Sequence, residues 1–273
     1  MGLELINKKY TNPENLKKLA EQFQNAQPCK HIMLENFFEE EFANTIHDNF
    51  PAFESLNVVR KSLNENKRED YHFERWHPAF AKLRDGMITD EVSKFMSTLT
   101  GIEGLFTNTD SLGQGVHQGG KGSFLDVHID VNVNVGKGLW RRVNLLVYMN
   151  KGWQPEWKGD IEIWNKDMTE MAVKYPPTFN TAVIFLTDKN SPHGYEKINF
   201  PDGEYRKSYY AYFFTPMEEG VKYEDSRFLS KPTDSAGKKI ATSLKENLKI
   251  TAKQILSKLN IKSLDFQDKN KKD

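Results

Sequence analysis

The most informative stretch of the sequence places two metal-binding residue types two positions apart. His128 and Asp130 lie in FLDVHIDVNVNV, residues 124–135, a run rich in β-branched residues. On a β-strand, residues i and i+2 project from the same face, so the imidazole and the carboxylate would point into one space. His193, in NSPHGYEKI after the apolar run TAVIFLT, offers a third ligand. Two histidines and one carboxylate form the facial triad that is typical of non-haem Fe(II) oxygenases.

A cation and a hydroxyl follow His193 on the next predicted strand. Arg206 and Ser208, in YRKSYY, alternate onto one face of an aromatic run. A guanidinium fork beside a hydroxyl can bind a carboxylate. A metal with three protein ligands and a carboxylate clamp together predict a keto acid held at both ends, as 2-oxoglutarate would be. Taken singly, each feature has a structural explanation, because an HxD pair can simply form a hydrogen bond and a lone arginine often pairs with a surface acid.

The order of these segments resembles the 2-oxoglutarate and Fe(II)-dependent dioxygenases of the prolyl 4-hydroxylase-like group, in their bacterial single-domain form. The resemblance covers residues 28–216 and is strongest from Gly113 onward. It rests on four segments: GVHQGGKGSFLDVHID, RRVNLLVYMNKGW, KGDIEIW and SPHGYEKINFPDGEYRKSYYAYFFT. Two positions depart from the family pattern. Lys158 replaces the first glycine of a usual GG pair, and Thr181 stands where arginine is frequent.

The resemblance implies a role for each site residue. The implied Fe(II) ligands are His128, Asp130 and His193. Arg206 is implied to bind the distal carboxylate of 2-oxoglutarate, assisted by Ser208, with O2 as the other co-substrate. Asn144 and Tyr148, which would share a strand face with Arg142, are further candidates for the co-substrate pocket. Related halogenases replace the carboxylate ligand with Gly or Ala, so the retained aspartate favours hydroxylation of an unactivated C–H bond, with conversion of 2-oxoglutarate to succinate and CO2.

The sequence around these residues predicts a mainly β fold with flanking helices, a double-stranded β-helix or jelly roll of the cupin-like kind. Residues 105–216 contain short β-rich runs separated by turn residues. Residues 1–104 carry helical spacing and first strands; the helical runs are NPENLKKLAEQFQNA, FEEEFANTIHDNFPAF and TDEVSKFMSTLTG. We expect a single dioxygenase domain over residues 1–273.

A C-terminal extension and helix are predicted for residues 217–262. The helix has an apolar face formed by Ile240, Leu244, Leu248, Ile255 and Leu259. This pattern predicts an amphipathic helix packed on the body of the protein or on a partner, and it could mediate a homodimer. Residues 263–273 are charged and are expected to be disordered.

Composition limits the partners. The chain has 273 residues, with 38 Lys plus Arg and 38 Asp plus Glu, so no net charge attracts it to nucleic acid or an anionic membrane. The lone Cys29 excludes an intrachain disulfide, and the N-terminal residues lack the apolar segment of a signal peptide. No apolar run is long enough to span a bilayer. We expect a cytoplasmic protein that binds a small molecule or peptide, and neither nucleic acid nor a membrane.

Several other residues have a structural and a functional interpretation. His117, between glycines, is interpreted as a solvated loop residue rather than a substrate contact. Arg141 and Arg142 alternate on a strand, so one of them should face the pocket or a buried acid. The segment YHFERWHPAF is interpreted as a connector rather than a lid, and Cys29 as buried and inert. Selectivity is expected to come from KGDIEIW and from residues 60–88.

Two rival functions stay open at this point. One is a cupin-type metal-dependent sugar isomerase or epimerase, which would release no succinate. The other is a non-catalytic metal and keto-acid sensor, which would consume no O2. A prolyl, amino-acid or peptide substrate is favoured by the resemblance, while glycans and natural-product intermediates remain alternatives because a shared fold does not select a substrate.

Overall fold

The computed structural model describes residues 2–221 and 223–258, without the side chains of Val135 and residues 252–258. Its strands are β1 (His31–Glu35), β2 (Val58–Lys61), β3 (Glu65–Asp70), β4 (Gln114–Gly119), β5 (Phe124–Ile129), β6 (Val133–Asn134), β7 (Leu139–Tyr148), β8 (Ile161–Trp164), β9 (Met171–Tyr175), β10 (Thr181–Leu186), β11 (His193–Tyr195), β12 (Arg206–Pro216) and β13 (Arg227–Phe228). Its α-helices are α1 (Lys8–Thr11), α2 (Pro13–Asn25), α3 (Glu40–Asp48), α4 (Pro78–Met87), α5 (Asp90–Thr100) and α6 (Ala236–Lys258). Short 3-10 helices occur at Leu3–Leu5, Phe53–Ser55, Phe73–Arg75, Val135–Lys137 and Pro155–Trp157.

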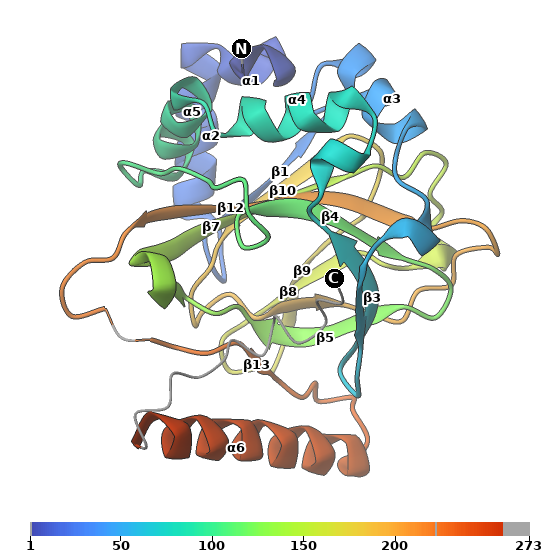
Figure 1. Cartoon of the computed structure of the whole chain (residues 1–273), viewed down its shortest axis with the longest axis vertical. Helices are drawn as coiled ribbons and strands as arrows, with labels where there is room; N and C mark the ends of the chain where they lie inside the picture. The colour runs from blue at the N-terminus through green and yellow to red at the C-terminus, as the bar shows by residue number, and fades with distance from the viewer. Residues whose placement is uncertain (1, 222, 259–273) are drawn as a thin grey trace.

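The strands form two facing halves of one antiparallel sheet. The hydrogen-bonded order is β1-β10-β7-β12-β4-β3-β5-β11-β8-β9, and β3 joins the two halves because it pairs with both β4 and β5. Figure 1 shows β1, β10, β7, β12 and β4 in an upper layer and β5, β8 and β9 in a lower one. This arrangement is the expected jelly roll, and its interior lies between the layers.

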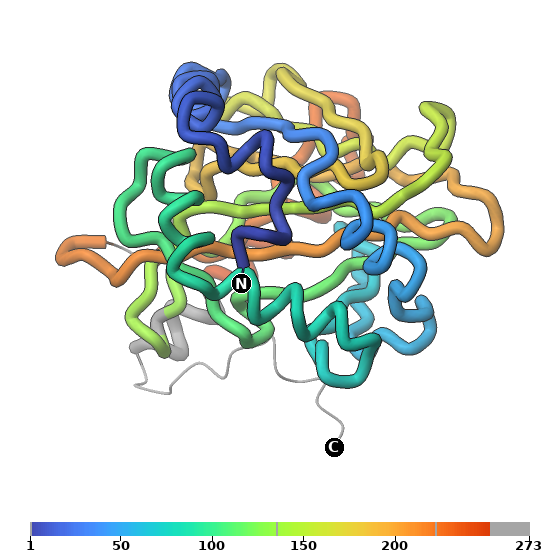
Figure 2. Tube along the Cα trace, turned by 90° about the horizontal axis from the view of Figure 1, so that it is seen from above, coloured from blue at the N-terminus to red at the C-terminus, as the bar shows by residue number. Residues whose placement is uncertain are grey.

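Helices α1 to α5 cover the outer face of the upper layer, as the blue to teal segments seen from above in Figure 2 indicate. The Asn12 side chain accepts hydrogen bonds from the backbone N–H groups of Glu14 and Asn15 and so caps α2, while Gly101, with φ +68°, ends α5. Buried side chains from the helices and from the upper layer form one core between them, among them Phe23, Phe80, Leu83, Phe95, Val147 and Phe213. None of the helices in the described ranges combines the length and apolarity needed to cross a bilayer.

The predicted helices and strands of the first 216 residues largely match the structure. The three helical runs correspond to α2, α3 and α5. YHFERWHPAF connects β3 to α4, and the His77 side chain accepts a hydrogen bond from the backbone N–H of Ala79 at the start of that helix. One prediction was wrong: GQGVHQGGKG contains the strand β4, so His117 lies in the sheet and not in a loop.

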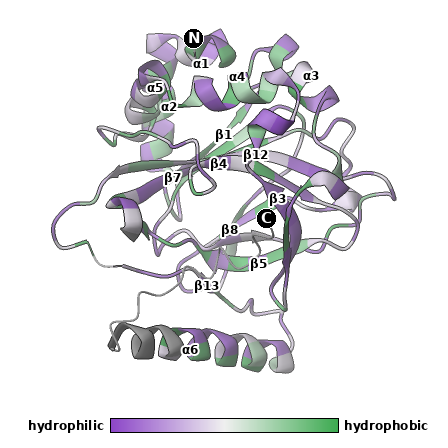
Figure 3. Cartoon of the chain, viewed as in Figure 1, coloured by the Kyte–Doolittle hydropathy of each residue, from purple (hydrophilic) through white to green (hydrophobic). Residues whose placement is uncertain are grey.

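Helix α6 lies on the opposite side of the molecule from α1 to α5, below β5 and β13 (Figure 1). It carries both hydrophobic and hydrophilic residues along its length (Figure 3). Its apolar face does not pack on the body, which contradicts that part of the sequence prediction: Ile240, Leu244 and Leu248 are 61%, 58% and 70% exposed. The helix contacts the body through polar side chains instead. Docking of this face on a partner, and the homodimer, stay predictions. The Ile255 side chain, Leu259 and the predicted tail lie outside the described residues.

Candidate metal and keto-acid site

Two neighbouring strands bring the three predicted metal ligands together. His128 lies near the end of β5, Asp130 directly follows that strand, and His193 begins β11. Strands β5 and β11 are antiparallel with His193 opposite His128. A Cβ on Gly194 would lie 2.6 Å from the Leu125 carbonyl oxygen, so a glycine after His193 permits this close pairing. The ligand atoms of His128, Asp130 and His193 all lie within 4.8 Å of one another.

Backbone carbonyl groups orient both imidazole rings. His128 Nδ1 lies 3.1 Å from the carbonyl oxygen of Asp126, and His193 Nδ1 lies 2.9 Å from that of Ser191. Because a carbonyl can only accept, each Nδ1 carries the proton and donates it. Each Nε2 then presents a lone pair, and these atoms lie 3.5 Å and 3.9 Å from the two Asp130 oxygens. Fixing the tautomer in this way is what the outer hydrogen bonds of metal-bound histidines do.

The charge states of the cluster suit a divalent cation. Burial lowers the pKa of His193 to about 4, and His128 adds to the shift, so the His193 imidazole is neutral at pH 7. Burial alone would raise the pKa of Asp130, but His128 and His193 outweigh it and hold this pKa below its ordinary value. Asp130 Oδ2 is buried and has no hydrogen-bond partner among the described residues. A buried ionised oxygen without a partner is costly, and a metal ion would satisfy it. The donor set therefore fits a ferrous ion with open coordination positions.

Arg206 is a buried guanidinium with no carboxylate partner among the described residues. It is 5% exposed at the start of β12. Its Nε donates to the Gly159 carbonyl oxygen at 2.6 Å and its Nη2 to the Tyr148 hydroxyl at 3.1 Å. Its charge also lies over the Tyr195 ring, 4.0 Å from the centroid. These contacts fix the guanidinium plane and leave donor capacity for an anionic ligand.

The pocket beside the cluster contains most of the remaining predicted residues. Its lining includes His128, His193, Arg206, Ser208 and Asn144. Ser208 Oγ and Asn144 Oδ1 are buried and have no partner among the described residues, so both are available to a ligand. Tyr148 is fully buried and acts through Arg206, since its hydroxyl accepts the Arg206 hydrogen bond and it is not part of the lining.

A charged wall of this pocket was missed by the sequence analysis. Lys67 of β3 and His117 of β4 line the pocket, and both face Glu69, with nitrogen to oxygen distances of 3.2 Å and 3.4 Å. Burial, with a smaller contribution from the charge of Lys67, lowers the pKa of His117 to about 4. The interpretation of His117 as a solvated loop residue is therefore wrong. Nothing local in ENKRED indicates that these charges point inward, because the pairing of β3 with β4 decides it.

A β-bulge decides which of the two adjacent arginines faces the interior. In the pairing of β7 with β12, Phe213 lies opposite Val143 and Phe214 opposite Arg141, so Arg142 is the extra residue. Arg141 thereby shares the face of Asn144, whereas strict alternation would have placed Arg142 there. Arg141 is 6% exposed, its guanidinium lies 3.8 Å from the Tyr212 ring centroid, and its Nε has no hydrogen-bond partner among the described residues.

Lys158 sits in a backbone conformation that suits glycine. Its φ is +57° and its ψ is −159°, a region that costs about 1–3 kcal/mol for other residues. We expect Lys158→Gly to raise the free energy of unfolding by about 1 kcal/mol, since relief of this strain exceeds the added chain entropy. Urea denaturation would measure it. Lys166, which has no positive φ, is the control: Lys166→Gly should not stabilise. A Lys158→Gly protein no more stable than the wild type would show that the backbone conformation at Lys158 costs no free energy.

The comparisons with known proteins agree with this site. Residues 114–214, less than half of the chain, match the model of the 2OG-Fe(II) oxygenase superfamily. This region includes all three residues of the cluster, Arg206 and Ser208. No curated protein matches the chain.

Solved structures share the fold at low sequence identity. A Pseudomonas putida prolyl-4-hydroxylase is 17% identical with a TM-score of 0.50, covering 71% of this chain and 97% of its own. A prolyl hydroxylase from Trichoplax adhaerens, solved with a hypoxia inducible factor peptide fragment, is 16% identical with a TM-score of 0.52, covering 78% and 95%. HygX from Streptomyces hygroscopicus, solved with nickel and 2-oxoglutarate, is 13% identical with a TM-score of 0.51, covering 76% and 96%. The family match over residues 114–214 supports the resemblance to 2OG-Fe(II) oxygenases noted in the sequence, and the solved prolyl hydroxylases share the fold.

Proposed function

We propose that the protein is a 2-oxoglutarate and Fe(II)-dependent dioxygenase that hydroxylates an unactivated C–H bond. One observation carries the proposal: two members of the cluster, His128 and His193, line one pocket with Arg206, which has no carboxylate partner among the described residues. The third member, Asp130, has its ligand atom within 4.8 Å of theirs. A dicarboxylic keto acid satisfies the metal cluster and Arg206 at once. The family match over residues 114–214 supports the same co-substrate.

Each residue has a defined task in this proposal. His128, Asp130 and His193 would hold Fe(II), and three protein ligands would leave coordination positions open for the co-substrates. Arg206 binds the far carboxylate, and the hydroxyl of Ser208 offers a further hydrogen bond. Fe(II), when bound, would supply the redox chemistry for oxidative decarboxylation of 2-oxoglutarate to succinate and CO2 with O2, coupled to hydroxylation of the substrate C–H bond. The protein contributes orientation and the exclusion of water.

We further propose that the substrate is of the prolyl, amino-acid or peptide type. Arg141 supports this proposal because its unpartnered Nε and stacked guanidinium suit a carboxylate or carbonyl oxygen of such a substrate. Two of the structures with the same fold are prolyl hydroxylases by name, although a shared fold does not select a substrate. Mass spectrometry of proline-containing peptides and free amino acids after incubation should detect a gain of one oxygen atom. A gain only on glycans or other natural products would refute this substrate class.

The test of the reaction class is an anaerobic titration of the purified protein with Fe(II) and then 2-oxoglutarate. Chelation of the keto acid to the iron should give a visible charge-transfer band, which should bleach when O2 is admitted, with release of succinate. If Fe(II) binds but 2-oxoglutarate produces no band, the dioxygenase proposal fails and a metal-dependent isomerase or epimerase takes precedence. A band that persists in O2 with every substrate tried would identify a sensor instead.

A further inference from the structure

The C-terminal segment reaches the strand that carries His128. Strand β13 pairs with β5 so that Arg227 lies opposite Ile129 and Phe228 opposite His128. The Phe228 ring lies 5.7 Å from the His128 ring, measured between centroids. This segment lies outside the region that matches the superfamily model, residues 114–214. The metal cluster of this chain therefore has a neighbour that the family pattern does not supply.

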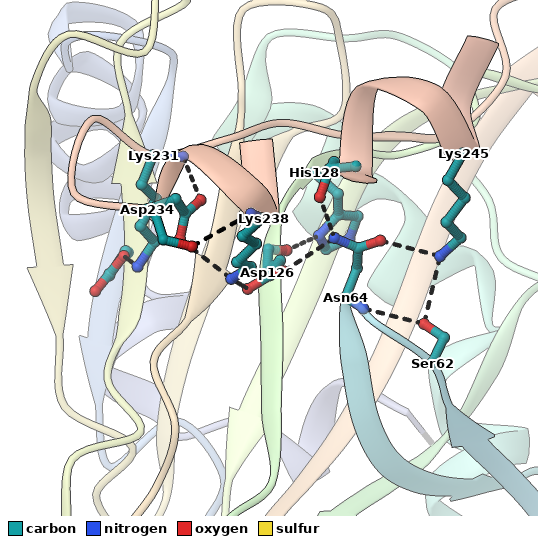
Figure 4. Close-up of polar contacts among 11 residues, drawn as sticks. Ser62, Asn64, Asp126, His128, Lys231, Asp234, Lys238 and Lys245 are labelled. Carbon is teal, nitrogen blue, oxygen red and sulfur yellow. Dashed lines mark hydrogen bonds and ion pairs between the residues drawn. The ribbon is translucent and has the colours of Figure 1, made fainter. Parts of the chain in front are cut away.

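Helix α6 binds the side chain of Asp126, the residue whose backbone carbonyl orients His128. The Lys238 ammonium donates to Asp126 Oδ1 at 2.7 Å, and Asn64 Nδ2 donates to Asp126 Oδ2 at 3.0 Å. Asn64 also contacts Thr242 of α6 at 2.9 Å. Figure 4 shows Lys238 directed at Asp126, with Asn64 between Asp126 and Lys245. The backbone carbonyl of this same Asp126 accepts the hydrogen bond from His128 Nδ1. Asp126 thus links the helix to the histidine: its side-chain carboxylate binds Lys238 of α6, and its backbone carbonyl binds His128 Nδ1.

A second anchor lies beside the other histidine. The Lys231 ammonium donates to Glu162 Oε2 at 2.6 Å. Glu162, on β8, lies opposite Gly194, which directly follows His193. Trp164 Nε1 also donates to Glu162 Oε2, so this carboxylate is fixed from two directions. The segment therefore attaches to β5, and to β8 next to β11.

The contacts of Lys238 and Lys231 with the body are better explained as positioning the metal ligands than as stabilising the fold. Partly buried ion pairs add little net stability, because desolvation offsets their attraction. Ile240, Leu244 and Leu248 of α6 face solvent and do not add to the core. What the lysines do provide is fixed geometry at β5, which carries His128, and at β8, which pairs with the strand that carries His193. Outer hydrogen-bond partners of metal ligands tune metal affinity.

We propose that residues 227–242, the C-terminal strap, position the metal ligands: Lys238 acts through Asp126 on His128, and Lys231 acts through Glu162 on the strand next to His193. This inference rests on the proposed metal site. Lys238 and Lys231 are positioning residues and touch neither iron nor substrate.

The test is a titration of the full-length protein with Co(II), whose visible spectrum reports coordination geometry. Lys238→Met should weaken Co(II) binding about 10-fold and change the spectrum, which is the usual effect of losing an outer-shell partner. Lys238→Arg should restore both. The matched control is Lys239→Met, because among the described residues the Lys239 ammonium donates only to the Pro232 carbonyl. This variant should bind Co(II) as the wild type does. Lys231→Met, tested separately, should also weaken binding, so the inference stays testable if one variant folds poorly.

Two outcomes separate this inference from the proposed function. If Lys238→Met and Lys231→Met melt at lower temperature yet keep the wild-type Co(II) affinity and spectrum, the strap is merely structural and the inference is overturned. If the wild-type protein itself binds neither Co(II) nor Fe(II), the proposed function fails first.

Discussion

Alanine in place of His193 should reduce Fe(II) affinity by roughly 100-fold or more, beyond the effect of losing an outer partner, because it removes one of three ligands. The remaining ligands, His128 and Asp130, lie two residues apart at the end of β5. They would leave the metal ion without a ligand from β11. No charge-transfer band should form with 2-oxoglutarate at Fe(II) concentrations that saturate the wild type. Anaerobic calorimetric titration with Fe(II) would measure the affinity directly.

His31 provides a matched control for this variant. It is also a buried histidine, and its Nδ1 lies 2.9 Å from the carbonyl oxygen of Cys29, two residues earlier, as in the site histidines. It does not belong to the cluster of metal-ligand types found among the described residues. His31→Ala should therefore lower thermal stability and leave Fe(II) affinity unchanged. Equal Fe(II) affinity in wild type and His193→Ala would remove His193 from the site.

Lysine in place of Arg206 should weaken 2-oxoglutarate binding by about 100-fold while Fe(II) affinity stays near that of the wild type. Lysine keeps the charge but loses the planar fork, including the Nε hydrogen bond to Gly159 that sets its orientation. Two charge-assisted hydrogen bonds to a carboxylate at about 1.5 kcal/mol each account for this magnitude. Titration of the Fe(II) protein with 2-oxoglutarate, followed by the charge-transfer band, would give the affinity.

Arg142→Lys is the control for Arg206→Lys. Arg142 lies over the Trp140 ring and is the bulged residue of β7, so it is not on the pocket face. Its replacement should leave 2-oxoglutarate affinity unchanged. An Arg206→Lys protein with wild-type 2-oxoglutarate affinity would show that the keto acid binds elsewhere, even if the Fe(II) site is intact.

The sequence alone was sufficient for the centre of the site. His128 and Asp130 share a face because strand alternation is a local, covalent property, and the same alternation pairs Arg206 with Ser208. His193 could be added because a ligand type in the right order along a β-rich region matches a known family pattern. Short β-rich runs separated by turn residues likewise located most strands, and helical spacing located α2 and α5.

The surroundings of the site were decided only by the tertiary structure. One bulge between β7 and β12 turns Arg141 toward the interior, where strict alternation would have placed Arg142. A bulge depends on how two distant strands pair. Lys67 and His117 face inward because β3 joins the two halves of the sheet, which no local pattern encodes. On helix α6, Lys238 contacts the body, whereas Leu244 and Leu248 of the predicted apolar face are exposed to solvent. Periodicity fixes which residues share a face, whereas long-range contacts decide which face is buried.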